Sequence, residues 1–542
     1  MESPIKSGGI FTRQATGLVR QLSFTDMFVF NASFVNVGLA VLYMALYVPG
    51  FHPGGSMVVA TIVAAIIAIP TSLVYGMLSA AYPRSGGEYV FVSRVMGPMW
   101  GMVAGWNMMI WGIFYIGVPC ALFARYGVAP LLRFAGISYD VPALNGLAEQ
   151  VGTPTGTFIT GLIALVIILL LYVRGTRVWA RVQNILFYVG AVAILISIVT
   201  LLFASPDTVA QRLSHYMNHV GGSDGYAALL ADVTENAESN NAPFSWLMTF
   251  LVLSWPCYNL FWSNATTYFG GEVRQQVRAQ VFSLPLAVLF SGMFMVILLA
   301  LAESRFGFGL LGSIARLDPE VLGFTFTPSF NELCAIISAT PLLGIVILIG
   351  FLYWCVAWAP VAIGAVTRVW LAWSLDYMWP KKFSEVNPRF HTPVFALVFC
   401  GVMGMVCLAL FAYIPTFGLL VGAFGVFITF MLASVAGLLM PFRRPQQFES
   451  SGIAWRIGRL PVISLMGALS ILFLAVVEVS ILFDPVSGIS LSPTYEDGGP
   501  FFMLLLNLLV FFCGFIYYAI RKWLLKRRGI DIGLAFNEIP PE

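Results

Sequence analysis

Long uncharged stretches of apolar residues recur along the whole chain. An α-helix needs about twenty such residues to cross the roughly 30 Å hydrocarbon core of a bilayer. Only 10% of the residues are charged and 59% are hydrophobic, and a water-exposed surface cannot be built from that composition. The sequence therefore predicts an all-α integral membrane protein with twelve transmembrane helices, at about 24–48, 57–80, 98–118, 157–173, 182–203, 244–269, 281–302, 341–366, 394–412, 416–440, 461–483 and 501–520.

Lysine and arginine are divided unevenly between alternate loops. If the N-terminus is cytosolic, the tails and loops on that side hold 23 of the 28 basic residues, which is the pattern of cytoplasmic loops. We therefore expect a multi-pass protein of the cell membrane with both termini cytosolic. The net charge of +3 arises from these topology signals and does not indicate nucleic acid binding. The expected partners are the lipid bilayer and a small molecule, and the sequence indicates no oligomeric state.

Residues suited to catalysis or metal binding are rare inside the predicted spans. His215 and His219 could share one face of a helix in the long 205–243 loop, but no third ligand follows at a fixed spacing, so a solvated helix is the preferred interpretation. Glu478, in the eleventh span, is expected to reach the outer interface. No ATP-binding loop and no cluster of catalytic side chains is present in the sequence. We predict no cofactor, no metal site and no enzymatic activity.

The sixth predicted span contains polar and helix-breaking residues at its centre: Ser254, Trp255, Pro256, Cys257, Tyr258 and Asn259. Proline removes a backbone donor and its ring clashes with the preceding turn, so carbonyl groups lose their helical partners. Unwound backbone is tolerated at this depth only where it is packed in protein or lines a wet cavity, and such broken helices mark binding sites in transporters. The alternative is a simple proline kink.

The first predicted span is similarly polar, with Asn31, Ser33, Asn36, Val37 and Gly38 near its centre. Taken alone, these residues suit helix packing, because amides and hydroxyls bond across helices and glycine allows close approach. Two interrupted helices at corresponding positions of two halves indicate a transporter site instead. Spans one to five and six to ten would then be inverted repeats.

The loop after the second span contains the most distinctive motif. Residues 82–98 read YPRSGGEYVFVSRVMGP, in which a proline and paired glycines predict a tight turn. Further segments follow: GMVAGW from Gly101, GGEVR from Gly270, TR from Thr367, DYMWP from Asp376 and HTP from His391. Together they resemble the amino acid permeases of the amino acid, polyamine and organocation superfamily.

The resemblance implies a LeuT-like fold, with a 5+5 inverted repeat plus two accessory helices. Spans one and six would unwind around a small substrate, and spans three, eight and ten would wall the site. The implied organisation is a cytosolic N-terminal tail (1–22), a transporter core (23–440), accessory spans eleven and twelve (441–524) and a cytosolic C-terminal tail (525–542).

The implied function is a secondary active or exchange transporter of amino acids or related small amines, working by alternating access. A non-transporting amino acid sensor on the same fold is the alternative, and it would bind ligand without flux. The glycine-rich break of the family falls at about Asn36-Val37-Gly38, with asparagine in place of one glycine. The gating aromatic of the family falls on Tyr258 or Trp255.

The eighth span bears on ion coupling. Sodium-coupled members of this fold bind the ion with two hydroxyls of this span, whereas residues 359–366 read APVAIGAV and contain no hydroxyl. The lysine that replaces the ion in some relatives is also absent from residues 182–203. Facilitated transport, exchange, or proton coupling through an unidentified residue remain, and exchange is favoured.

Overall fold

The computed structural model describes residues 20–221, 223–324, 327–414, 422–484, 486–489, 491, 499–530, 532 and 536, and most of them are helical. Within these ranges, eleven helical segments are long and apolar enough to cross a membrane: Phe24–Phe51, Met57–Ala81, Pro98–Ser138, Pro154–Val173, Thr176–Phe203, Val277–Phe306, Pro341–Leu375, Val394–Tyr413, Ala423–Arg443, Val462–Phe483 and Gly499–Arg527. The predicted all-α, multi-pass architecture is therefore confirmed.

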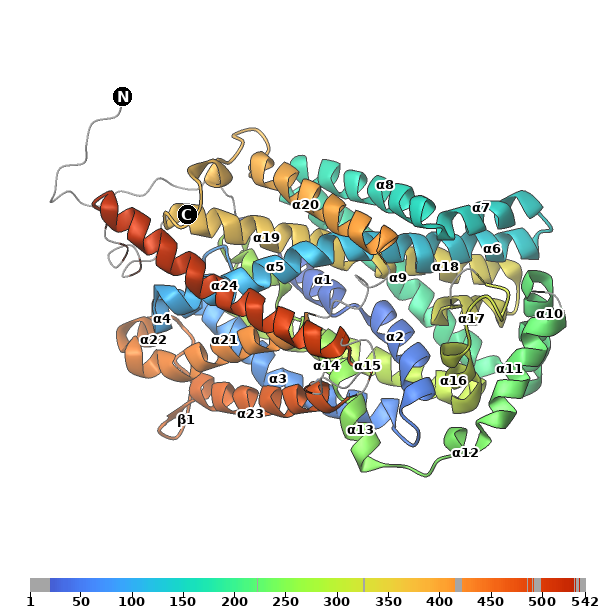
Figure 1. The fold of residues 1–542 in the computed structure, drawn as a ribbon. Helices are drawn as coiled ribbons and strands as arrows, with labels where there is room; N and C mark the ends of the chain where they lie inside the picture. Colours follow the sequence, from blue (N-terminus) through green and yellow to red (C-terminus); the bar gives the residue numbers. More distant parts are fainter. Residues whose placement is uncertain are drawn as a thin grey trace.

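Several of these segments are composed of more than one helix. The helices that form them are α1 (Phe24–Val35), α2 (Val37–Phe51), α3 (Met57–Ala81), α5 (Pro98–Leu122), the π-helix η1 (Phe123–Val128), α6 (Ala129–Ser138), α8 (Pro154–Val173), α9 (Thr176–Phe203), α15 (Gln276–Phe306), α18 (Pro341–Val356), α19 (Trp358–Leu375), α20 (Val394–Tyr413), α21 (Ala423–Arg443), α23 (Val462–Phe483) and α24 (Gly499–Arg527). Figure 1 shows that most of them run along one common direction.

Shorter elements connect these helices. They are α4 (Glu88–Met96), α7 (Pro142–Gly152), α10 (Pro206–Gly221), α11 (Ser223–Glu235), α12 (Ala237–Asn240), α13 (Trp246–Val252), α14 (Ser254–Leu260), η2 (Ala265–Tyr268), η3 (Gly270–Glu272), α16 (Phe308–Arg316), α17 (Phe330–Ile336), η4 (Lys381–Ser384), α22 (Pro445–Ser450) and a two-stranded antiparallel hairpin of β1 (Arg456–Ile457) and β2 (Leu460–Pro461).

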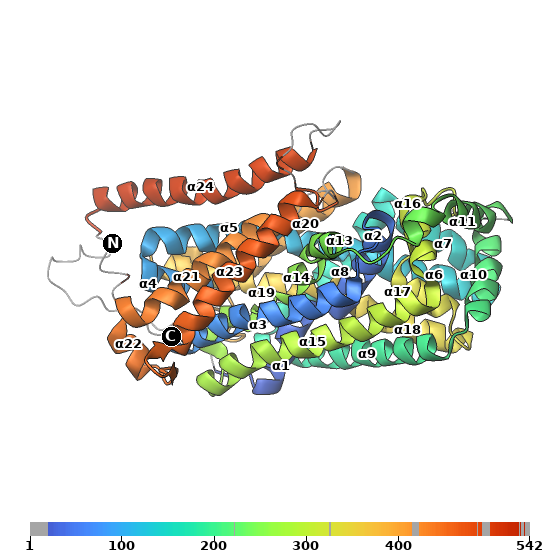
Figure 2. The ribbon, with the colours of Figure 1, turned by 90° about the horizontal axis from the view of Figure 1, so that it is seen from below.

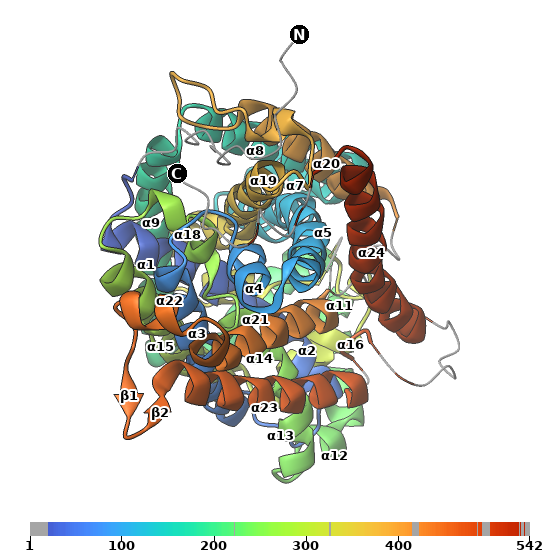
Figure 3. The same ribbon diagram turned by 90° about the vertical axis from the view of Figure 1, so that its left-hand side faces the viewer.

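Burial separates central helices from peripheral ones. In the first span, 94% of the most apolar stretch is buried, whereas in α8 and α24 only 28% is, so the apolar faces of these two helices are left for lipid. Figures 2 and 3 show α24 along the outside of the bundle. Glu478 of α23 is only 8% exposed, so the expectation that it reaches the interface is wrong.

The two ends of the bundle carry different loops. The loop at 205–243 forms α10, α11 and α12 at one end, and α4 and α22 lie at the opposite end (Figure 1). His215 and His219 are exposed on α10, and the described residues contain no group of three potential metal ligands. The 205–243 loop therefore lies at the end of the bundle opposite to α4 and α22.

Candidate functional site

The first span is interrupted at a single residue. Asn36, between α1 and α2, has a left-handed backbone with φ of 58°. Asparagine tolerates this conformation better than most residues because its short amide can bond to the local backbone. Its Oδ1 accepts a hydrogen bond from the N–H of Leu39 at 3.2 Å, and its Nδ2 donates to the carbonyl of Trp354 at 2.8 Å. Asn36 therefore caps α2 with its own side chain.

The groups around this break also have protein partners. Trp358 Nε1 donates to the carbonyl of Phe34 at 2.6 Å, which satisfies one of the last carbonyls of α1. A Cβ on Gly38 would lie 2.5 Å from Cγ of Trp354, so α18 can approach this closely only because residue 38 is glycine. Asn36, Val37 and Gly38 are consequently all buried between α18 and the core.

Asn31 joins the two interrupted spans. Its Oδ1 accepts a hydrogen bond from the N–H of Thr266 in η2 at 3.1 Å, and its Nδ2 donates to Ser283 Oγ of α15 at 3.1 Å. Ser33 donates to the carbonyl of Val29 at 2.5 Å and also contacts the hydroxyl of Tyr353. Ser33 thus contributes to helix packing. Asn31 accepts a hydrogen bond from a backbone N–H of the sixth span that has no partner within a regular helix.

The sixth predicted span consists of short helices, but its interruption lies later than the sequence predicts. The N–H of Cys257 donates to the carbonyl of Leu253 at 3.2 Å, so α14 continues across Pro256 with only a kink after α13. The chain unwinds instead at residues 261–264, before the 3-10 turn η2. The prediction that the helix break lies at Ser254–Asn259 is therefore wrong. The alternative of a simple proline kink applies at Pro256.

The side chains of Tyr258 and Trp255 lie in two different clusters, and that of Tyr258 is aromatic. Tyr258 contacts Tyr115 of α5 and Trp358 of α19, with ring centroids 6.3 and 5.9 Å apart. Trp262, in the unwound segment, lies 5.6 Å from Tyr115 and 6.5 Å from Tyr258. We call Tyr115, Tyr258, Trp262 and Trp358 the aromatic cluster. Among the residues that the structure describes, no hydrogen-bond partner is found for the buried Nε1 of Trp262.

A small cavity lies beside this cluster. Its volume is about 10 Å³, enough for about one water molecule. It is lined by Phe34, Met108, Met109, Gly112, Tyr115, Trp262, Tyr268, Ala362, Ala365, Val366 and Val369. The cavity therefore touches α1, α5, α19 and the unwound part of the sixth span, and it is almost entirely apolar. A ligand of several heavy atoms requires the aromatic side chains to move apart.

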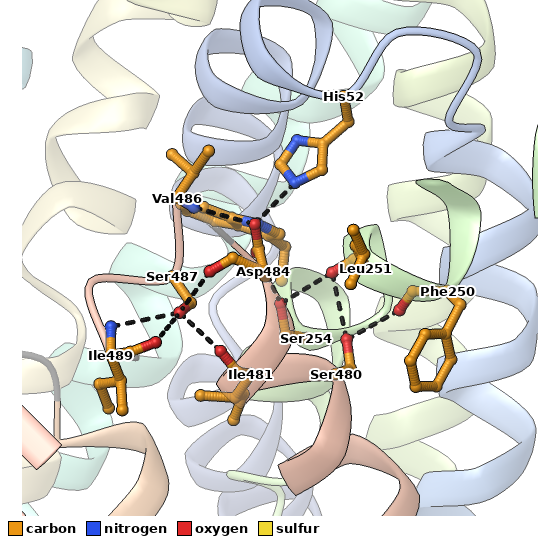
Figure 4. Close-up of polar contacts among 11 residues, drawn as sticks. His52, Phe250, Leu251, Ser254, Ser480, Ile481, Asp484, Val486, Ser487 and Ile489 are labelled. Atoms are coloured by element: carbon orange, nitrogen blue, oxygen red, sulfur yellow. Dashed lines mark hydrogen bonds and ion pairs between the residues drawn. The ribbon is translucent and has the colours of Figure 1, made fainter. Parts of the chain in front are cut away.

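Trp255 belongs to a buried polar cluster near the ends of α2 and α23. Figure 4 shows Asp484, which follows α23, between His52 after α2 and Ser254 of α14. Asp484 Oδ1 lies 2.9 Å from His52 Nε2, and its Oδ2 accepts from Trp255 Nε1 at 3.1 Å and from Ser254 Oγ at 3.4 Å. The ring of Trp255 stacks on Tyr47, 5.4 Å away. We call His52, Ser254, Trp255 and Asp484 the outer cluster.

Cys257 and Asn259 belong to neither cluster. Among the described residues, no hydrogen bond from either side chain to another helix is found. Asn259 Nδ2 donates to the carbonyl of Trp255 within α14 at 3.2 Å, and Cys257 is fully buried. These two residues shape α14, and their predicted contact with a substrate stays a prediction.

At the opposite end, the two distinctive loops meet. The N–H of Gly86 donates to the carbonyl of Tyr268 at 3.1 Å, and Ser85 pairs with Phe269 in an isolated antiparallel bridge. Beside them, Arg368 of α19 forms a fully buried ion pair with Glu272 at 2.9 Å. The loop that reads YPRSGGEY thus packs on the exit of the sixth span.

Sequence reasoning missed Tyr115, Trp262 and Trp358. An aromatic residue in an apolar span is ordinarily a packing residue, and these three meet only when helices far apart in sequence pack together. Trp262 was the one residue open to detection, because it lies four positions after Tyr258 and extends the same helical face.

Comparisons with known proteins agree with the fold and the motifs. The family model described as amino acid permease matches residues 22–512. The chain is similar to a methylthioribose transporter of Bacillus subtilis (strain 168), with 22% identity over 84% of this chain and 87% of the relative. It is also similar to a branched-chain amino acid permease of the same organism, with 23% identity over 78% and 80%.

A shorter match links the chain to a polyamine transporter of Oryza sativa subsp. japonica, with 32% identity over 25% of this chain and 21% of the relative. The family model covers most of the chain, and the relatives are named as transporters rather than enzymes. The chain therefore belongs to the amino acid permease family and is a multi-pass membrane transporter protein, not an enzyme.

Proposed function

We propose that the protein is a secondary transporter that moves an amino acid or a related small amine across the cell membrane by alternating access. The observation that carries the proposal is the pair of interrupted helices: Asn36 breaks the first span, residues 261–264 break the sixth, and Asn31 bonds one to the other. Such pairs mark the substrate site of transporters built from inverted repeats.

The proposed architecture is twelve spans, of which ten form a LeuT-like 5+5 repeat and α23 and α24 are accessory. In this assignment α13, α14 and η2 together form the sixth crossing in chain order. This crossing is too interrupted to count as one long helix, and it raises the number of spans from eleven to twelve. Residues 23–440 are the proposed core, 441–524 the accessory spans, and 1–22 and 525–542 cytosolic tails. The peripheral position of α24 supports its accessory role.

The proposed substrate site is the space between the first-span break and the aromatic cluster. We assign Asn36, Val37 and Gly38 to one wall of this proposed site and Tyr258 and Trp262 to the other. The lining of the small cavity supports the assignment through Phe34, two residues before Asn36, and through Trp262. Aromatic faces attract an ammonium group, which favours a substrate with an amine. The Trp262 Nε1 offers a buried donor that a ligand oxygen can satisfy.

The small size of the cavity determines the first step of the proposed transport cycle. The cavity that the described residues line has room for only about one water, so the aromatic side chains must part before a substrate enters. We propose that opening at the outer cluster admits substrate and that opening at the Gly86–Tyr268 contact releases it. The missing hydroxyls at 359–366 support a sodium-independent cycle.

The test is a thermal-shift screen followed by uptake. Purified protein is screened against the amino acids, putrescine, spermidine and methylthioribose, because a ligand that binds the folded state raises its melting temperature. Every stabilising compound is then measured, in radiolabelled form, for uptake into proteoliposomes with sodium or choline. Saturable uptake supports a transporter. Stabilisation without flux would favour the sensor instead.

A further inference from the structure

Glu88 is a buried carboxyl at the end of the molecule where the YPRSGGEY loop packs. It is the first residue of α4, between the α3 and α5 spans, and it is fully buried. The turn before it holds Gly86 and Gly87 at φ of 123° and 58°. A Cβ on Gly87 would lie 2.5 Å from the Tyr268 ring, so this turn can press Glu88 against the sixth span only because residue 87 is glycine.

The surroundings of Glu88 do not favour a negative charge. Within the described residues, neither carboxyl oxygen has a hydrogen-bond partner of ordinary geometry. The titratable groups that face it are the phenols of Tyr75 from α3 and Tyr268 from η2. The amide of Asn264 completes the group, and both of its polar atoms also lack a partner among the described residues.

The neighbouring cations have other partners. On α4 itself, Arg94 pairs with Asp376 at 2.8 Å, and on α19 Arg368 pairs with Glu272. Arg84 donates to the carbonyl of Pro83 at 3.0 Å, and Arg444 donates to the carbonyl of Arg94 at 2.7 Å. The sequence of α5 contains no charged residue, and α21 contains only the terminal Arg443. Burial therefore dominates, and it raises the pKa of Glu88 to about 8.

Tyr268 connects Glu88 to the central cavity. Tyr268 is one of the residues that line that cavity, together with Phe34, Tyr115 and Trp262, and its ring lies against Gly87. A phenol both donates and accepts a hydrogen bond, so it can pass a proton between a water in the cavity and the carboxyl. The backbone of the same residue accepts from Gly86, so opening this end separates Glu88 from Tyr268.

We propose that Glu88 carries the coupling proton of this transporter: it holds the proton while the cytosolic end is closed and releases it to the cytosol when that end opens. The inference rests on the proposed transport function. On opening, the O–H bond of the carboxyl breaks, water accepts the proton, and the carboxylate is solvated. On return, a hydronium ion that enters the cavity from the opposite side gives its proton to the hydroxyl of Tyr268 and is left as water. The phenol passes its own proton to the carboxylate, so net proton entry accompanies substrate entry.

The first test needs no substrate. Infrared difference spectra of the purified full chain are recorded as the pH is raised through 8, and a protonated carboxyl band is expected to disappear with its midpoint there. Glu88→Gln should lack this transition. Glu478→Gln is the matched control, because Glu478 is also buried without a described partner but lies on α23, and it should leave the transition in place.

The second test measures coupling in proteoliposomes with radiolabelled leucine and putrescine as probes. An inward proton gradient should drive accumulation in the wild type and in Glu478→Gln, and Glu88→Gln should fall to the level seen without a gradient. Tyr268→Phe, which keeps the ring under Gly87, should slow the response. The folding of each variant is checked by its elution profile and melting temperature.

Two outcomes would overturn the inference alone: a wild type whose uptake ignores the proton gradient, or a Glu88→Gln protein that keeps the infrared transition. A wild type that shows the transition but transports neither probe, nor any compound of the wider panel, would overturn the transport function instead.

Discussion

At the scale of single residues, Asn36 determines what the first-span break offers to a ligand. The N-terminus of a half-helix attracts anions through its free N–H groups. Here the Oδ1 of Asn36 already occupies the N–H of Leu39, and the Gly38 surface is covered by Trp354. In the proposed substrate site, a substrate carboxylate therefore competes with the Asn36 side chain for the N–H of Leu39, which favours ligands bound through an amine or hydroxyl.

Replacing Asn36 with glycine should free this position. Glycine adopts the positive φ without strain and costs only a few tenths of a kcal/mol as a helix cap. We expect Asn36→Gly to fold normally and to bind carboxylate-bearing compounds more tightly relative to amines, measured by thermal shift across the same panel. Asn36→Ala is the control, because it also removes the cap but strains the backbone, so its melting temperature should fall. Equal ligand preferences in wild type and Asn36→Gly would contradict this role.

The two candidate gating aromatics should behave differently when each is replaced by alanine. Tyr258→Ala removes a face of the aromatic cluster and should weaken ligand binding by about 0.5–2 kcal/mol if an ammonium rests on it. Trp255→Ala removes a donor to Asp484 instead, so it should change transport rate more than affinity. Binding titrations and uptake rates separate the two effects. An unchanged affinity in a well-folded Tyr258→Ala protein would exclude Tyr258 from the site.

At the scale of elements, the helix α23 is bonded to both interrupted spans. Asp484 follows α23 and bonds to His52 beyond α2 and to Trp255 of α14, and Ser480 Oγ donates to the carbonyl of Phe250 at 2.7 Å (Figure 4). The halves of the first and sixth spans that lie nearest Asp484 therefore move together with α23 or must break these bonds to move apart.

Removing the Asp484 charge should loosen this end. Asparagine keeps one acceptor oxygen and places an NH2 group where the other was, so a donor of His52, Ser254 or Trp255 loses its acceptor. A buried donor left without its acceptor costs about 1–3 kcal/mol, so Asp484→Asn should favour opening at this cluster. Hydrogen exchange is expected to quicken in peptides from the ends of α2 and α14 and to stay unchanged in α4. Ser487→Ala is the control, because the described acceptors of Ser487 Oγ are backbone carbonyls at the end of α23 and in the loop after it: Ile481, Asp484 and Ile489. Equal hydrogen-exchange rates in both variants would contradict the conclusion that the Asp484 bonds hold these helix ends together.

The long helices could be predicted from the sequence because the lipid bilayer requires each membrane span to be apolar and helical. A span must be apolar and helical whatever it packs against, so eleven long helices follow from composition and charge placement. The break of the sixth span could not be located, because Pro256 is absorbed by a kink whereas residues 261–264, FWSN, contain neither proline nor glycine. The burial of Glu88 was equally hidden, since a glutamate in a polar loop normally faces water.

At the scale of the whole molecule, one buried acid makes stability depend on pH. The folded state holds the proton of Glu88 up to about pH 8, whereas a glutamate carboxyl in water has an ordinary pKa of 4.5. The folded state thus binds more protons in this range, and stability contributed by the neutral acid is complete below about pH 4.5 and is lost as the pH rises towards 8.

The melting temperature of the wild type should therefore fall between these two pH values. Each unit of pKa shift corresponds to about 1.4 kcal/mol, so the effect is a few kcal/mol at most. Glu88→Gln cannot ionise, and its melting temperature should exceed that of the wild type by a margin that grows with pH and levels off above 8. Differential scanning of both proteins in detergent measures the margin. A constant difference across the range would contradict the linkage.

The crowding of the aromatic cluster has an optical consequence. Tyr115 and Tyr258 lie within 6.5 Å of Trp262, close enough to transfer excitation energy to the indole, and Trp358 is next to both tyrosines. Any ligand larger than a water molecule has to spread these rings, which changes both the transfer and the polarity around Trp262. The emission of the unlabelled protein should therefore shift with each occupancy of the cavity, and Trp262→Phe identifies the part of the signal that belongs to the site.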